Sequence, residues 1–205
     1  DIEGYTYKTV VIGTQEWFAE NLRTTKYQDG TPINYPGADS ATWVDDTIGA
    51  YTWYNNDSTT YASTYGALYN WYSTVNPAVL CPTGWHVPSD SEWTVLENYL
   101  ETNGYNYDGS ITGNKYAKAM ADSVFWTFDV VQGCVGNIDY STYRNKSGFS
   151  GLPGARRNSI GNFFGLGGNL FLWSSSGYNT YEAYYRNLYF SNPNVIISQN
   201  LKVEG

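Results

Sequence analysis

The glycine-rich stretch that begins at residue 148 constrains the fold more than any other part of the sequence. It reads GFSGLPGARRNSIGNFFGLGGNLFLWSSS, with a glycine every few residues. Because a glycine inside a helix is about 1 kcal/mol less favourable than an alanine, no helix is expected here. Short strands are predicted at Phe171–Ser174, Ala183–Phe190 and Val195–Ile197. The last third of the chain is therefore expected to be sheet and ordered loops.

The clearest helix signal lies directly after Pro88. Ser89 and Glu92 have the spacing of a capping box, and Asn103-Gly104 gives a stop signal. Between them, apolar residues recur at helical spacing on one face: Trp93, Leu96 and Leu100. A second helix is predicted at 114–121, and strands at 5–12 and 15–18 read as an N-terminal hairpin. Together these elements predict an α+β fold with an antiparallel sheet.

Length and charge limit the classes of function. A chain of 205 residues can bury one core, so a single domain over residues 1–205 is expected. No stretch approaches the roughly 20 apolar residues of a membrane span. The net charge is −8, and the only basic pair is Arg156-Arg157. This composition argues against binding to nucleic acid or to anionic lipid, because both need clustered lysine and arginine.

Several blocks of sequence together resemble one known family. They are VIGTQEWFAENL at 11–22, YGALYNWY at 65–72, LCPTGWHVPSDSEW at 80–93, SGFSGLPG at 147–154 and WSSS at 173–176. The chain resembles the Fibrobacter succinogenes major paralogous domain, which occurs in secreted proteins and lipoproteins of Bacteroidetes and Fibrobacteres. The resemblance implies a C-type-lectin-like fold with a small antiparallel sheet, one or two helices and long ordered loops. It also implies that the protein is located in the extracellular space or at the outer-membrane surface of a bacterium. It further implies core positions for five tryptophans: Trp17, Trp71, Trp85, Trp93 and Trp173.

The sequence departs from this family at its end. Family members usually continue with a short strand of the type G-F-S-V-R-C, whereas this chain stops at Gly205. The resemblance then implies either an incomplete chain or a last strand supplied by another molecule, since an unpaired edge invites strand addition. The missing cysteine leaves the partner of Cys81 open, and a Cys81–Cys134 disulfide is one alternative.

Catalysis is not expected. The related formylglycine-generating enzymes work through late cysteines, and no cysteine follows Cys134. His86 is the only histidine, which excludes a multi-histidine metal centre and favours a structural role. No cofactor is expected, although calcium at an oxygen-rich loop stays open. The segment 106–109 resembles part of a calcium loop, but Gly104 and Lys115 stand where ligands should be.

The segment from Trp173 to Gln199 carries the candidate ligand contacts. It mixes tyrosine, asparagine, serine and arginine, which is the chemistry of adaptable binding surfaces. The candidates are Tyr178, Asn179, Tyr181, Tyr184, Arg186, Asn192 and Asn194. The sequence thus favours a cell-surface binding module, lectin-like or adhesin-like, that recognises a glycan or a protein. The alternative is a structural subunit of an extracellular filament or tip assembly, which self-associates by strand complementation.

Overall fold

The computed structural model describes residues 1–205. The chain begins with an antiparallel hairpin, β1 (Thr9–Ile12) and β2 (Gln15–Phe18), which turns at Gly13. The predicted hairpin is confirmed, but β1 begins four residues later than predicted. In the segment before β1, carboxylates accept hydrogen bonds from the backbone. Tyr5 donates its N–H to Asp1 Oδ1 at 2.9 Å, and Lys8 donates its N–H to Glu20 Oε1 at 2.7 Å.

Short elements fill the region that follows the hairpin. Three helices each begin at an Asp or Asn cap, as expected for residues whose side chain accepts from the first turn. In chain order the elements are α1 (Ser40–Asp45), β3 (Tyr51–Thr52), η1 (Tyr54–Asn56), α2 (Ser58–Tyr65), β4 (Leu68–Tyr69) and α3 (Trp71–Thr74). β3 pairs with β4.

The longest helix is α4 (Asp90–Thr102), and it confirms the sequence prediction. Ser89 and Glu92 form both hydrogen bonds of the capping box. The predicted apolar face is buried, and Glu97 is buried beside it. α5 (Ala117–Met120) confirms the second predicted helix in a shorter form, and η2 (Ser141–Tyr143) follows. No helix of the chain combines the length and the apolarity needed to cross a membrane.

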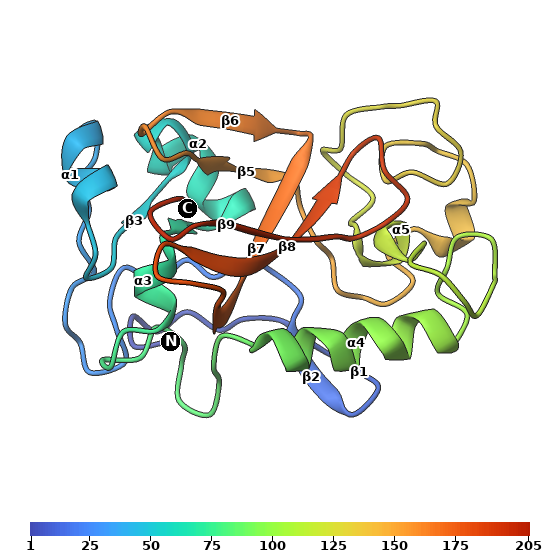
Figure 1. The fold of residues 1–205 in the computed structure, drawn as a ribbon, viewed down its shortest axis with the longest axis horizontal. Helices are drawn as coiled ribbons and strands as arrows, with labels where there is room; N and C mark the ends of the chain where they lie inside the picture. Colours follow the sequence, from blue (N-terminus) through green and yellow to red (C-terminus); the bar gives the residue numbers. More distant parts are fainter.

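Residues 154–201 form a five-stranded sheet in the order β6-β5-β7-β8-β9 (Figure 1). The strands are β5 (Gly154–Arg157), β6 (Phe163–Leu166), β7 (Asn169–Gly177), β8 (Glu182–Tyr189) and β9 (Ile196–Leu201). All neighbours are antiparallel except β5 and β7, which are parallel and share one bridge, Ala155↔Leu170. The structure therefore shows the mixed α+β class that the sequence predicts, with two strands more in this region than expected.

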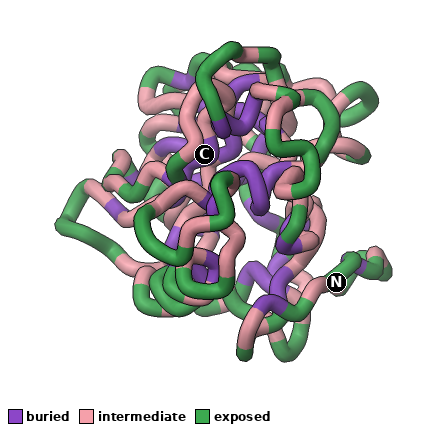
Figure 2. Tube along the Cα trace, turned by 90° about the vertical axis from the view of Figure 1, so that its right-hand side faces the viewer, coloured by how far each residue is buried: buried purple, intermediate pink, exposed green.

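The core consists of two apolar clusters. Figure 2 marks the buried residues in purple along the chain. The first joins the hairpin, α4, α5 and the sheet, and it holds Trp17 and Trp93 with ring centroids 4.7 Å apart. The second holds Tyr27, Ile33, Tyr51, Tyr69 and Leu80 beneath the short elements. Of the five tryptophans expected in the core, Trp17 and Trp93 are buried, whereas Trp71, Trp85 and Trp173 are half-buried.

Candidate functional site

The turn between β7 and β8 presents a group of tyrosines, here called the tyrosine surface: Tyr178, Tyr181 and Tyr184. Tyr178 is 52% exposed and Tyr181 is 73% exposed. The rings of Tyr178 and Tyr184 meet edge to face with centroids 5.3 Å apart. The predicted tyrosine contacts are therefore brought together at one turn, on a rigid pair of strands.

Asn179 holds this turn through its side chain and its carbonyl. Its Oδ1 accepts from the N–H groups of Tyr181 and Glu182 at 2.7 and 2.8 Å, and its Nδ2 donates to Glu182 Oε2 at 2.6 Å. Lys202 Nζ donates to the carbonyl of Asn179 at 2.7 Å. Asn179 is exposed, and its contact with a ligand stays a prediction.

Arg186 is likewise not a surface residue. Its side chain is 1% exposed and forms ion pairs with Glu97 and Asp90 of α4, both at 2.6 Å. The prediction that it contacts a ligand is therefore wrong. Arg186 points from β8 to the helix, and two carboxylates neutralise its buried charge.

Asn192 and Asn194 lie at the other end of β8, in the turn before β9. A strand of this length spans on the order of 25 Å, so the two asparagines do not join the tyrosine surface. Asn192 Oδ1 accepts from the N–H of Asn194 at 2.9 Å, whereas the Asn194 side chain is exposed.

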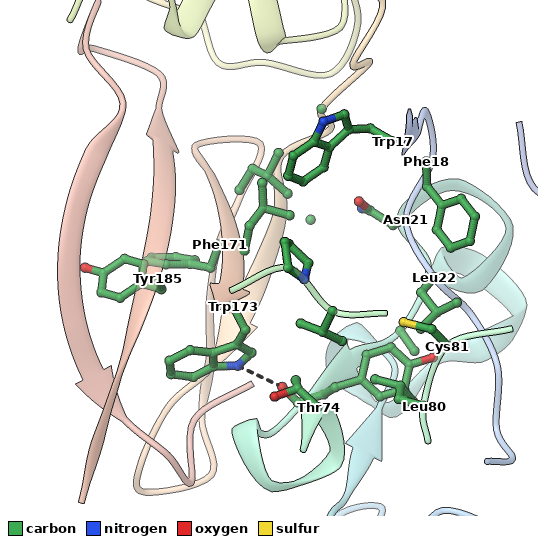
Figure 3. Close-up of a pocket in the computed structure, with 18 of the residues that line it drawn as sticks. Trp17, Phe18, Asn21, Leu22, Thr74, Leu80, Cys81, Phe171, Trp173 and Tyr185 are labelled. Carbon is green, nitrogen blue, oxygen red and sulfur yellow. Dashed lines mark hydrogen bonds between the residues drawn. The ribbon is translucent and has the colours of Figure 1, made fainter. Parts of the chain in front are cut away.

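A cavity of about 550 Å³ forms a second candidate site, and the sequence did not predict it (Figure 3). Its volume lies within the range of about 300–1,000 Å³ that is typical of ligand sites. Residues from five segments that are far apart in sequence line it: the segments 15–22, 65–69, 80–93, 149–156 and 170–173. Single residues from elsewhere also contribute: Thr74, Tyr185, Asn200, Glu204 and Gly205. Only the fold brings these segments together, so no local motif could have found the cavity.

The cavity wall is mainly aromatic and aliphatic. The rings of Phe18 and Trp85 contact each other in a tilted arrangement with centroids 4.3 Å apart, and Trp17 contacts Trp93. On the facing side, Trp173 donates its indole N–H to the carbonyl of Tyr69 at 3.1 Å. Figure 3 shows Trp17, Phe18 and Leu22 on one side, and Phe171, Trp173 and Tyr185 on the other.

Three polar atoms of the cavity wall are buried without a hydrogen-bond partner. They are Gln15 Oε1, Trp17 Nε1 and Arg156 Nε. More than 90% of buried polar groups in proteins are paired, and an unpaired one is unfavourable by about 1–3 kcal/mol. Four further buried atoms without a partner lie outside the cavity wall, on Arg23, Tyr27, Trp43 and Arg144, so these three do not by themselves mark a binding site.

The two cysteines do not form the disulfide considered from the sequence. Cys81 and Cys134 are both free and buried. Cys81 lies in the cavity wall, where burial raises the pKa of its thiol to about 12. Burial also raises the pKa of Cys134. Both side chains are thus protonated thiols at neutral pH, and a protonated thiol is a poor nucleophile and metal ligand.

The remaining polar candidates are bound within the chain. His86 is exposed at the cavity rim, and its Nε2 lies 2.9 Å from Glu92 Oε1 in the capping box. In the segment that resembles a calcium loop, Asp108 Oδ2 pairs with Lys115 Nζ at 2.7 Å, and Asn106 Nδ2 donates to the carbonyl of Ser110. No three His, Cys, Asp or Glu side chains gather as a metal site.

The structure thus defines a mixed α and β domain with a tyrosine surface at one turn and an apolar cavity between its sheets. The family model of the Fibrobacter succinogenes major domain matches residues 10–201. The chain belongs to this family, as its sequence blocks predict. Searches among curated proteins and among solved structures found no protein similar to this chain.

Proposed function

We propose that this domain is an extracellular binding module of a bacterial cell surface, which recognises a glycan or a protein through its tyrosine surface. The observation that carries the proposal is the exposure of Tyr178 and Tyr181 on a turn that Asn179 and Lys202 hold in place. A tyrosine offers a large, stiff contact area and a hydroxyl group, and it loses little conformational entropy on binding. A preformed turn reduces the ordering cost further.

Membership of the family supports an extracellular location and a C-type-lectin-like arrangement, and we propose both. Loops that a rigid scaffold holds in place often carry ligand contacts. The turn between β7 and β8 is such a loop, because both strands belong to the five-stranded sheet. The glycan or protein ligand is then reached from the sheet end that displays Tyr178, Tyr181 and Tyr184.

We propose binding without catalysis and without a cofactor. The raised thiol pKa values of Cys81 and Cys134 argue against a cysteine nucleophile. The pairing of Asp108 with Lys115 argues against calcium in that loop, because the lysine already neutralises the carboxylate.

A glycan array and a binding assay on intact bacterial cells test the proposal. The double variant Tyr178→Ala with Tyr181→Ala is expected to weaken binding about tenfold or more, because truncating one central aromatic contact costs about 2 kcal/mol. Tyr35→Ala is the matched control, since Tyr35 is also an exposed tyrosine but lies outside the tyrosine surface. Equal binding by the double variant and the control would contradict the proposal.

A further inference from the structure

β9 forms one edge of the five-stranded sheet, and no strand lies on its outer side. The bonds of β8 show which backbone groups of β9 point outward. The carbonyl of Glu182 accepts from the N–H of Tyr178 at 2.9 Å, so it points away from β9. Glu182 is the partner of Leu201 in register. Because bonded and non-bonded pairs alternate along an antiparallel ladder, Leu201, Gln199 and Ile197 direct their N–H and C=O groups outward.

Two of these three residues keep their outward groups free. Leu201 uses both of its own, since its N–H binds Asn200 Oδ1 and its carbonyl accepts from the N–H of Glu204. Ile197 and Gln199 form no backbone hydrogen bond outside the sheet ladder. The N–H and C=O groups of both residues are therefore available to an added strand.

The side chains beside this edge extend the tyrosine surface. Ile197 is 49% exposed and Leu201 is 38% exposed, and Gln199 between them is exposed as well. These three residues lie on one face of the sheet, because side chains alternate along a strand. The same face carries Tyr184, which is the partner of Gln199 in register. A strand added to β9 would thus meet an apolar residue, a polar residue next to a tyrosine, and a second apolar residue.

This face of the sheet is also acidic. Glu182 lies on it, and while its Oε2 accepts a hydrogen bond within the turn, its Oε1 has no partner in the chain. Asp90 of α4 binds Arg186 through Oδ1 at 2.6 Å and leaves Oδ2 without a partner. Arg186 also pairs with Glu97, so the three side chains together carry one negative charge. The charge that complements this face is positive.

We propose that the outer edge of β9 binds one extended segment of a partner protein, antiparallel to β9, in which an arginine or lysine stands between two apolar residues. The apolar residues cover Ile197 and Leu201, and the cation lies opposite Gln199. Alternate strands of a sheet are about 10 Å apart, which an arginine and a tyrosine side chain span together. The cation therefore reaches the ring of Tyr184 and the carboxylate of Glu182. The proposal rests on the function proposed above and narrows its ligand to a protein that binds by strand addition.

Charge favours a basic partner over a second copy of this chain. β9 itself contains no charged residue, so a second β9 would bring no cation to this face. The net charge of −8 on each copy would also oppose the pairing.

Fluorescence anisotropy with a labelled seven-residue peptide, SVTRTVS, tests the proposal on the intact 205-residue chain. In the antiparallel register the arginine N–H points to β9, whereas the threonine N–H groups point away. N-methylation at the arginine is expected to weaken binding about tenfold, because one hydrogen bond is lost. The matched peptide, N-methylated at the next threonine, is expected to bind like the parent. The peptide SVTETVS is expected to bind at least about tenfold more weakly, because its carboxylate meets an acidic face.

A pair of protein variants supplies the second arm. Ile197→Lys places a charge on the edge of β9, and natural proteins use such a lysine to prevent strand addition. This variant is expected to weaken binding of SVTRTVS about tenfold. Ile138→Lys is the matched control, since Ile138 is also exposed but lies outside the sheet, and it is expected to leave binding unchanged. Circular dichroism verifies that both variants fold.

Each opposite result overturns a defined part of the proposal. Equal binding of the two methylated peptides would overturn strand addition, and equal binding of SVTRTVS and SVTETVS would overturn the basic partner. A dimer of the peptide-free chain that Ile197→Lys abolishes in analytical ultracentrifugation would assign the edge to a second copy. Failure of the proposed function is visible separately, as cell binding by the Tyr178→Ala and Tyr181→Ala double variant. If that variant loses cell binding but SVTRTVS does not bind, the edge assignment is wrong and the tyrosine surface stands.

Discussion

Buried polar groups are paired to different degrees in two regions of the molecule. Between β8 and α4, the guanidinium of Arg186 binds both Glu97 and Asp90. Among the residues that line the cavity, Gln15 Oε1, Trp17 Nε1 and Arg156 Nε have no partners. The contact between β8 and α4 is thus satisfied within the chain, whereas the cavity wall keeps unpaired polar atoms.

This difference separates buried polar groups that stabilise the domain from buried polar groups that reduce its stability. Unpaired buried groups are unfavourable, and proteins keep few of them. The tyrosine surface follows a different principle, because its polar atoms face water before any ligand binds.

The largest expected effect comes from breaking the ion pairs of Arg186 with Glu97 and Asp90. Arg186→Met leaves the buried Glu97 carboxylate and Asp90 without their cation, and a broken buried ion pair costs about 3–5 kcal/mol. Urea denaturation is expected to show this loss as a lower midpoint with an unchanged slope. Tyr178→Ala is the control, since it changes an exposed side chain and should leave the midpoint nearly the same. A small effect of the arginine variant on the midpoint would show that the stability of the contact between β8 and α4 does not depend on these ion pairs.

Two tryptophans sharpen the contrast between the paired and the unpaired groups. Trp173→Phe removes an indole N–H that binds the carbonyl of Tyr69, whereas Trp17→Phe removes one that has no partner. Both substitutions remove similar volume from the cavity wall. The Trp173 variant is expected to lose about 1 kcal/mol more free energy of unfolding than the Trp17 variant, which is the net value of one hydrogen bond. Equal losses in thermal or urea unfolding would show that Trp17 Nε1 is satisfied in solution.

The sequence predicts the parts of this molecule that depend on local signals. α4 is such a part, because Ser89, Glu92 and the apolar face lie within one helix of the chain. The hairpin at Gly13 and the β7–β8 turn with its tyrosines are others. In each case the residues that decide the structure are neighbours in sequence.

The rest depends on contacts between distant segments. β5 and β6 contain glycines and are stabilised by their sheet neighbours, so the composition of these segments does not predict strands. Arg186 looks like a surface contact in its polar segment, but its partner Glu97 lies 89 residues earlier. The cavity requires the hairpin, the 80–93 segment and β7 to meet, and no single segment of the sequence indicates it.

The smallest expected effect concerns an exposed ion pair, and it sets the scale for the buried one. The side-chain hydrogen bond from Lys115 lowers the pKa of Asp108 from 3.8 to about 2, and Ser110 contributes to the shift. Because the folded-state pKa is depressed, the stabilisation is present above pH 3.8 and is lost as the pH falls through about 2. Asp108→Asn is therefore expected to lower the Tm slightly at neutral pH, and the difference should vanish near pH 2.

The effect of Asp108→Asn on the Tm should stay far below that of Arg186→Met, because solvent screens the exposed pair. A difference between variant and parent that does not change with pH would show that the carboxylate charge of Asp108 contributes nothing, and that only its hydrogen bond to Ser110 matters for this loop.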